Sequence, residues 1–238
     1  MPDIAAMTSL GQSYRALVLG SSGGIGGAFV DLLRSDPACA EVVGLSRSGD
    51  GFDVTDEDSV AAAAARLAEA EHRFDLVLVA TGALVIEGNG PEKTIKAIKA
   101  DVMAAQFALN AIGPALVMKY FAPLLSHEGK SILAVLSARV GSIGDNRLGG
   151  WISYRSAKAA LNQITRTSAI EIARLRPKSI VVSLHPGSVD TGFSGGFSKN
   201  HDRVSPSESV ANMLSVLDRL EPAQTGGFFA YDGQPIEW

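Results

Sequence analysis

The sequence has almost no cysteine and no excess of basic residues. Cys39 is the single cysteine among 238 residues, which excludes an intrachain disulfide and a cysteine-based zinc site and fits a reducing, cytoplasmic location. The 21 lysines and arginines are outnumbered by 25 aspartates and glutamates, for a formal net charge of −4. Because no long basic run is present, nucleic acid is not expected as a partner.

A long apolar run is also not apparent in the sequence. Residues 1–13 have neither a basic start nor a long apolar core, so we expect a short tail and not a secretory signal. No stretch approaches the roughly 18 apolar residues of a membrane-spanning helix, and no membrane association is expected. Hydrophobic residues nevertheless make up 46% of the chain. This is enough for one sizeable core, so we expect residues 1–238 to form a single domain.

Short apolar runs alternate with longer helical stretches. Strands are expected at residues 16–19, 41–45, 76–80, 131–136, 180–184 and 227–231. Helices are expected after a Gly/Ser loop as far as about residue 35, and at residues 60–71, 91–101, 103–125, 153–175 and 206–220, with a kink or break at Gly113-Pro114. This alternation predicts an α/β fold, a single Rossmann domain whose doubly wound parallel sheet has helices on both faces.

A glycine-rich turn follows the first expected strand. Residues 20–26 read Gly-Ser-Ser-Gly-Gly-Ile-Gly and precede a helix. Gly20, Gly24 and Gly26 allow a tight turn and a close approach of a phosphate to the backbone, next to the free N–H groups of a helix N-terminus. Such a turn can be purely structural, but its place in the first strand–helix unit favours a dinucleotide site.

Tyr154 and Lys158 lie four residues apart at the start of a long expected helix. Positions i and i+4 share one helix face, so the ammonium can lie near the phenol and lower its pKa. A phenol tuned in this way can act as a general acid or base. The alternative is a solvated surface pair, which is common on helices.

Together the Gly-x-x-x-Gly-x-Gly loop and the Tyr-x-x-x-Lys pair resemble the short-chain dehydrogenase/reductase family. Further matches occur in the family's order over about residues 14 to 233: Asp53-Val54, Asn110, Ser137, Pro186-Gly187 and Thr191. Within the family, residues 137–146 and the ending 231–238 look like the C-factor-like subgroup.

The resemblance implies an NAD(P)-dependent oxidoreductase that transfers hydride between a nicotinamide and a carbonyl or alcohol, a small-molecule substrate. Tyr154 would donate the proton, Lys158 would lower the phenol pKa and bind the nicotinamide ribose, Ser137 would bind the carbonyl oxygen, and Asn110 would hold a relay water. The resemblance places the cofactor beside Gly20, Ser22, Gly24, Ile25, Gly26, Arg47, Asp53, Val54, Ala80, Thr81, Gly82, Tyr154, Lys158, Pro186, Gly187, Val189 and Thr191.

The end of the second expected strand bears on the choice of cofactor. It carries Ser46-Arg47 and no acid, and a guanidinium can pair a 2′-phosphate whereas a carboxylate would hold the 2′-OH of NAD. We therefore expect NADP(H) in preference to NAD(H), with a solvated loop charge as the alternative for Arg47. The family's Asn-Asn-Ala-Gly is replaced by Val-Ala-Thr-Gly at residues 79–82, which indicates a divergent branch.

Several assignments stay open. Ser142 competes with Ser137, because 17 residues separate Ser137 from Tyr154 where about thirteen are usual in the family. Asp53 either contacts adenine or belongs to a stretch, Asp53-Val54-Thr55-Asp56, in which an Asp or Thr caps the next helix. No metal-ligand spacing is recognisable. We expect residues 191–205 to form a loop over the substrate and the family resemblance implies a homodimer or homotetramer. An epimerase or dehydratase is disfavoured by the short C-terminal region, and a dinucleotide-binding signalling protein of C-factor type is the main alternative.

Overall fold

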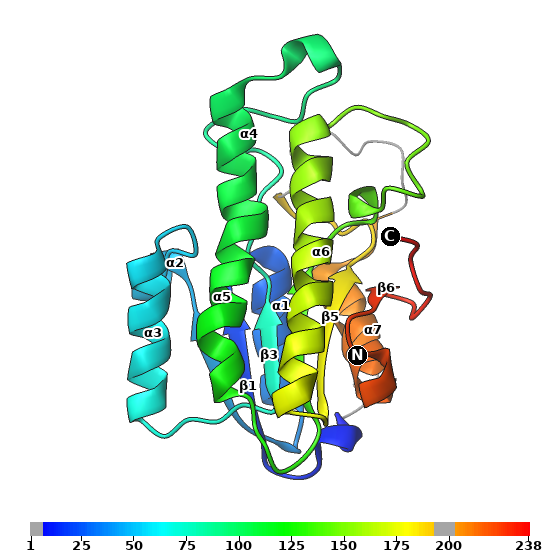
Figure 1. The fold of residues 1–238 in the computed structure, drawn as a ribbon. Coiled ribbons are helices and arrows are strands. Elements are labelled where there is room, and N and C mark those ends of the chain that lie inside the picture. The colour runs from blue at the N-terminus through cyan, green and yellow to red at the C-terminus, as the bar shows by residue number, and fades with distance from the viewer. Residues whose placement is uncertain (1–6, 193–202) are drawn as a thin grey trace.

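Six parallel strands form one sheet in the computed structural model, which describes residues 7–192 and 203–238 (Figure 1). The sheet order is β2-β1-β3-β4-β5-β6, and every neighbouring pair runs parallel. The strands are β1 (Tyr14–Leu19), β2 (Cys39–Leu45), β3 (Leu76–Val79), β4 (Ser131–Leu136), β5 (Ser179–His185) and β6 (Phe228–Ala230). This sheet confirms the predicted doubly wound α/β fold.

Helices cover both faces of the sheet. They are α1 (Gly24–Ser35), α2 (Arg47–Asp50), α3 (Glu57–Glu69), α4 (Ala100–Phe107), α5 (Gly113–Phe121), α6 (Ile152–Leu175) and α7 (Pro206–Arg219). In the view of Figure 1, α5 and α6 lie in front of the sheet and α1 lies behind it. Because parallel strands need crossover connections, each face is shielded from water.

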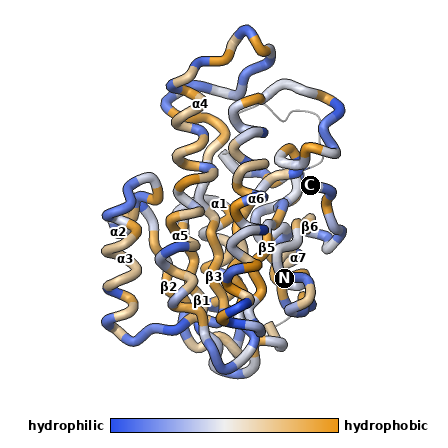
Figure 2. The backbone as a smooth tube through the Cα atoms, viewed as in Figure 1, coloured by the Kyte–Doolittle hydropathy of each residue, from blue (hydrophilic) through white to orange (hydrophobic). Residues whose placement is uncertain are grey.

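The core follows the alternation of side chains along each strand. Ala16 and Val18 of β1 pack with α1 and α7, whereas Leu17 and Leu19 pack with α3, α5 and α6. All four are fully buried, and burial of one aliphatic side chain contributes about 1.5–3 kcal/mol. Figure 2 shows the resulting hydrophobic centre along the strands.

The predicted helix at residues 91–101 is wrong for most of its length. Residues 91–94 form no helix, a short 3-10 turn covers Ile95–Ala97, and α4 begins only at Ala100. Tertiary contacts hold this segment in an irregular arm, residues 83–99, between β3 and α4. Local propensity therefore does not decide its conformation.

The predicted helix at residues 103–125 is present but compound. A π-helical turn, Ala108–Ile112, links α4 to α5, and Pro114, which has no N–H to donate, directly follows this irregular turn. The helical run Ala100–Leu124 is long and apolar enough to cross a membrane by length and composition, which corrects the expectation that no such stretch exists. In this fold its Val117 and Phe121 are buried in the core.

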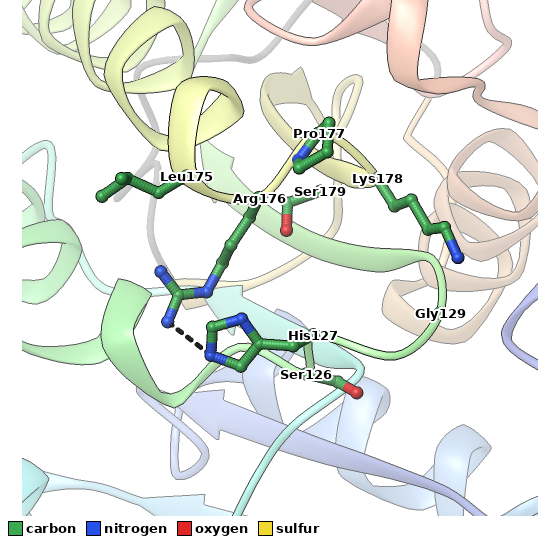
Figure 3. A pocket seen from close by; sticks show the side chains of 8 residues that line it. All are labelled: Ser126, His127, Gly129, Leu175, Arg176, Pro177, Lys178 and Ser179. Carbon is green, nitrogen blue, oxygen red and sulfur yellow. Dashed lines mark hydrogen bonds between the residues drawn. The ribbon is translucent and has the colours of Figure 1, made fainter.

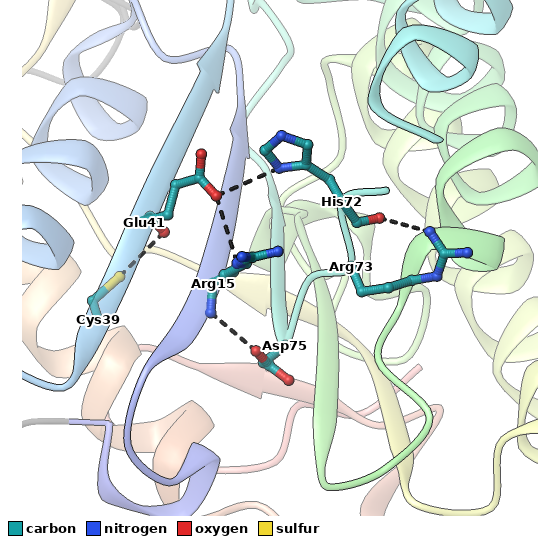
Figure 4. Close-up of polar contacts among 6 residues, drawn as sticks. All are labelled: Arg15, Cys39, Glu41, His72, Arg73 and Asp75. Carbon is teal, nitrogen blue, oxygen red and sulfur yellow. Dashed lines mark hydrogen bonds and ion pairs between the residues drawn. The ribbon is translucent and has the colours of Figure 1, made fainter. Parts of the chain in front are cut away.

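Charged side chains join the edge strand to its neighbours at the end of the sheet where the strands begin (Figure 4). Glu41 on β2 lies 3.6 Å from Arg15 Nε on β1 and 3.4 Å from His72 Nδ1. The backbone N–H of Arg15 donates to Asp75, at 2.9 Å. Exposed pairs of this kind contribute about 0–1 kcal/mol each, so they support the edge but do not define the fold.

Candidate active site

The strand order reverses between β1 and β3, and this is the point where open α/β sheets bind ligands. Gly20 follows β1 and Gly82 follows β3, so both lie at the carboxyl edge of adjacent strands. The structure therefore brings the predicted glycine loop and residues 80–82 together.

The glycine loop leaves no room for side chains. Gly20 has a φ of +89°, and a Cβ there would lie 2.9 Å from the carbonyl group of Ala80. A Cβ on Gly26 would overlap the carbonyl oxygen of Gly20, and one on Gly24 would lie 2.8 Å from Cγ2 of Thr191. These contacts pack the loop against β3 and bring Thr191 to the start of α1. A dinucleotide phosphate fits such a backbone cradle at a helix N-terminus.

Gly82 lies next to two of the predicted catalytic residues. Its φ is +142°, and a Cβ there would lie 2.8 Å from Oδ1 of Asn110 and 3.6 Å from Nζ of Lys158. Asn110 and Lys158 come from the π-turn after α4 and from α6. The structure thus brings two of the four predicted catalytic side chains to one point beside the cofactor loop. Thr81 Oγ1 is buried there and has no hydrogen-bond partner among the described residues, which is consistent with a group that faces a ligand.

Tyr154 and Lys158 are buried, with exposed fractions of 4% and 3%. The ammonium of Lys158 donates to the carbonyl oxygen of Leu136 at 2.8 Å and lies 5.9 Å from the centre of the Tyr154 ring. The pair is therefore not the solvated surface pair that was the alternative. Helix α6 presents both side chains toward the end of β4.

In the protein without a bound ligand, burial shifts the pKa of both side chains. It raises the pKa of the Tyr154 phenol well above its ordinary value and lowers the pKa of the Lys158 ammonium to about 7. The expected lowering of the phenol pKa by Lys158 is therefore not found. The physical reason is that loss of solvent disfavours the charged form of each group.

Asn110 is fully buried and holds the start of the arm. Its side chain accepts from Ala83 N at 3.2 Å and donates to Ala83 O at 2.9 Å and to Oε1 of Gln106 at 2.7 Å. Gln106 in turn donates to Leu84 O at 3.0 Å. Sequence reasoning missed Gln106, although two polar residues four apart on an apolar helix were a usable signal.

Ser137 follows β4 and is buried, and its hydroxyl donates to Oδ1 of Asn162 at 2.7 Å. The other candidate, Ser142, is also buried and accepts from Asp145 N at 3.0 Å. Asn162 lies on α6 one turn beyond Lys158 and was missed in the sequence. Its Nδ2 is buried and has no hydrogen-bond partner within residues 7–192 and 203–238.

The adenine side of the predicted site lies between β2 and α3. Arg47 begins the short helix α2 and is exposed. Asp53 accepts from the backbone and hydroxyl of Thr55, at 2.9 and 2.7 Å, and these bonds hold its pKa below the usual range. The N-cap of α3 is Asp56, whose side chain accepts from Asp58 N. The cap therefore does come from the stretch 53–56, but from Asp56 and not from Asp53. Val54 is buried against Gly113 of α5.

The turn after β5 completes the edge of the site. Gly187 has a φ of +80°, and a Cβ there would lie 2.8 Å from the Tyr231 ring. Pro186 O accepts from the Ser209 hydroxyl at 2.6 Å, which ties the turn to α7. Val189 forms a parallel bridge with Val204. Residues 193–202 of the predicted substrate loop lie outside the described residues.

A surface pocket lies at the opposite end of the sheet (Figure 3). It is lined by Ser126, His127, Gly129, Leu175, Arg176, Pro177, Lys178 and Ser179. These residues flank the starts of β4 and β5, whereas the predicted site residues lie beyond the strand ends. The candidate active site is therefore the carboxyl edge, where the buried polar groups converge, and not this pocket.

The chain is similar in sequence to known oxidoreductases and to a signalling protein. Residues 39–235 match the family model described as enoyl-(acyl carrier protein) reductase. A 1-hydroxy-2-glutathionyl-2-methyl-3-butene dehydrogenase of Rhodococcus sp. (strain AD45) is 32% identical over 188 residues, 79% of each chain. The C-signal protein of Myxococcus xanthus is 38% identical over 138 residues, 57% of this chain and 78% of that protein.

Solved structures show the same architecture. NADPH-bound carbonyl reductase from chicken fatty liver superposes with a TM-score of 0.80 at 28% identity, over 95% of both chains. A short-chain dehydrogenase/reductase from Burkholderia multivorans with bound NADP superposes with a TM-score of 0.77 at 28% identity, over 95% of this chain and all of that one. This chain therefore belongs to the short-chain dehydrogenase/reductase family of NAD(P)-dependent oxidoreductases.

Proposed function

We propose that the protein is an NADP-dependent carbonyl reductase that interconverts small aldehydes or ketones and alcohols. The observation that carries the proposal is the meeting of Lys158 and Asn110 at Gly82, beside the glycine loop and one helical turn from Tyr154. A dinucleotide site and a buried proton donor at one sheet edge are the two parts that carbonyl reduction needs.

The residues of the chain would handle the proton. A bound nicotinamide dinucleotide supplies the hydride to the carbonyl carbon. The hydroxyl proton of Tyr154 moves to the carbonyl oxygen, so that an alcohol and a phenolate result. Lys158 stabilises the phenolate through its positive charge, and proton return regenerates the phenol. Ser137 donates a hydrogen bond to the carbonyl oxygen and stabilises the charge that develops there.

The preference for NADP rests on Arg47. This side chain is exposed at the first residue of α2, directly after β2 and next to the switch point. A guanidinium there can pair a 2′-phosphate through two hydrogen bonds. Two superposed structures carry NADPH or NADP by their descriptions.

A turnover assay tests the proposed function. Purified protein is mixed with NADPH or NADH and a panel of aldehydes, ketones and quinones, and cofactor oxidation is followed by absorbance. We expect steady NADPH oxidation with at least one carbonyl class and lower kcat/KM with NADH. NADPH binding without turnover on any carbonyl would contradict the proposal.

That negative outcome would favour the second candidate, a dinucleotide-binding signalling protein of C-factor type. The observation behind this candidate is the 38% identity to C-signal over 138 residues. A protein that only senses the dinucleotide needs no proton donor. Tyr154→Phe would then leave dinucleotide binding unchanged.

An oligomeric state and a cellular location are also part of the proposal. The family resemblance implies a homodimer or homotetramer through the long helices, which carry Ile112 and Ile170 at exposures of 52% and 48%. Light scattering measures the mass directly, and a monomer at micromolar concentration would contradict this. The single cysteine, which is free, supports a cytoplasmic location.

A further inference from the structure

Helix α6 carries Tyr154 but has no cap of its own. Its N-cap residue is Trp151, which has a left-handed backbone (φ 55°, ψ 37°) and no side-chain capping bond. The first N–H groups of any helix lack intrahelical partners and need an acceptor from elsewhere. The left-handed conformation of a tryptophan also has to be held by its surroundings.

The missing acceptor comes from Glu92, 61 residues earlier in the chain. The Glu92 carboxylate accepts from Ser153 N at 3.2 Å and from the Ser153 hydroxyl, and the Glu92 backbone oxygen accepts from Trp151 N. Glu92 is 7% exposed and Ser153 is 1% exposed. Over residues 7–192 and 203–238, no cation pairs with Glu92. The helix N–H groups and the helix dipole therefore balance this buried charge.

The two residues that Glu92 holds are neighbours of the phenol. Ser153 directly precedes Tyr154. The Trp151 ring meets the Tyr154 ring edge to face, with centroids 6.5 Å apart and an interplanar angle of 67°. One carboxyl residue thus restrains both the backbone before Tyr154 and the aromatic surface against its ring.

The arm that contains Glu92 is held at two points. Asn110 holds its start at Ala83, and Glu92 holds its middle to α6. The arm therefore links residues beside the cofactor loop to the first turn of α6. A shift of the arm would therefore act on the turn of α6 that carries Tyr154.

We propose that Glu92 is a positioning residue for Tyr154, which caps α6 in place of Trp151 and sets the orientation of the phenol toward the substrate. This inference rests on the proposed function, because it gives the capping contact a role in proton donation by Tyr154. The competing interpretation is a contact that only stabilises the fold. The two differ in what happens to Tyr154 when Glu92 is changed in a protein that still folds.

The experiment uses the full chain and four variants. Glu92→Ala removes the acceptor, Glu92→Gln keeps an acceptor oxygen but loses the charge, and Ser153→Ala removes one of the two donors. Glu87→Gln is the matched control, because Glu87 is an exposed glutamate in the same arm. All rates are expressed per folded molecule, with folding checked by circular dichroism.

Two readouts do not depend on turnover. Amide exchange by NMR reports the Ser153 N–H, and carbon-labelled tyrosine reports the titration of Tyr154, assigned with Tyr154→Phe. In Glu92→Ala we expect Ser153 to exchange at least ~10-fold faster and the Tyr154 phenol to titrate at lower pH than in the parent protein. Glu92→Gln should lie between, and Glu87→Gln should match the parent.

The third readout compares the change in kcat with the change in the Kd for NADPH. Glu92→Ala should lower kcat by about 10- to 100-fold, because small misplacements of a reacting group are costly, and should change the Kd for NADPH by less than ~2-fold. A folded Glu92→Ala with the parent's kcat and the parent's tyrosine titration would overturn the inference. If the parent protein reduces no carbonyl, the proposed function fails, while exchange and titration still decide whether Glu92 positions Tyr154.

Discussion

The hydroxyl of Ser137 donates its proton to Oδ1 of Asn162 at 2.7 Å, and Asn162 lies two turns beyond Tyr154 on the same helix. A hydroxyl has one proton to donate. A carbonyl oxygen that arrives at Ser137 therefore competes with Asn162 for it. This relationship ties the catalytic assignment of Ser137 to a residue that no motif indicated.

The first prediction compares the two serines. Ser137→Ala should lower kcat by about 100-fold, as loss of one preorganised donor does, and should lower the free energy of unfolding by about 1 kcal/mol because Asn162 loses a partner. Ser142→Ala should lower kcat by only about 3-fold. Steady-state kinetics and urea unfolding measure both effects. The reverse order of the kcat losses would assign the carbonyl contact to Ser142.

The second prediction concerns the proton donor. Tyr154→Phe removes the phenolic hydroxyl but keeps the buried ring, so kcat should fall at least ~100-fold while NADPH still binds. Carbonyl reduction and NADPH fluorescence titration measure the two properties. Tyr120→Phe is the control, since that hydroxyl donates to Glu57 on the outer surface. Retained turnover in Tyr154→Phe would contradict the proposed role of Tyr154 as the proton donor.

The third prediction follows from the pKa of Lys158, which burial lowers to about 7. Between pH 7 and the ordinary value near 10.4, the unfolded chain binds the proton that the folded chain has released. Stability should therefore rise with pH in this window, by at most about 1.4 kcal/mol per pH unit from this group. Unfolding of the cofactor-free protein between pH 7 and 9 measures the slope.

Lys158→Met is the control for this slope, because it keeps the size and apolar part of the side chain. His185 does not interfere, since burial lowers its pKa to about 4. The variant should show a flatter pH dependence than the parent protein. Equal slopes in the two proteins would mean that Lys158 stays protonated when folded.

The fourth prediction concerns cofactor choice. Arg47→Ala should raise KM for NADPH by about 10- to 100-fold, because a charge-assisted pair with a phosphate is lost. KM for NADH should change less than ~2-fold. Arg66→Ala, at an exposed position on α3, controls for the loss of a positive charge. A parent protein that used NADH as efficiently as NADPH would remove the basis for this role.

The fifth prediction uses two adjacent glycines of α1. A Cβ on Gly26 would overlap the Gly20 carbonyl oxygen, whereas one on Gly27 would lie 3.5 Å from its nearest neighbour outside the helix. Gly26→Ala should cost about 1–3 kcal/mol of stability and weaken NADPH binding. Gly27→Ala should be neutral or stabilise by up to about 1 kcal/mol through helix propensity. Thermal unfolding that ranks the two variants the other way would contradict the predicted packing.

The predicted fold was correct because its signals are local and repeated. Runs such as residues 131–136 are apolar throughout, and the structure has β4 at the same bounds. The helix at residues 91–101 failed because Glu92 is held by a partner distant in sequence. Its side-chain and backbone acceptors serve the N-terminus of α6, which leaves residues 91–94 outside any helix.

The sequence by itself determined the fold class, the glycine loop and the Tyr154–Lys158 pair, because each depends on spacings within one or two turns of chain. Only the tertiary structure decided that Asp56 and not Asp53 caps α3, that Asn162 engages Ser137, and that Glu92 caps the helix of Tyr154. The last two join residues 25 and 61 positions apart. Burial likewise set the pKa directions of Tyr154 and Lys158, and burial is a property of the packed molecule that no local spacing contains.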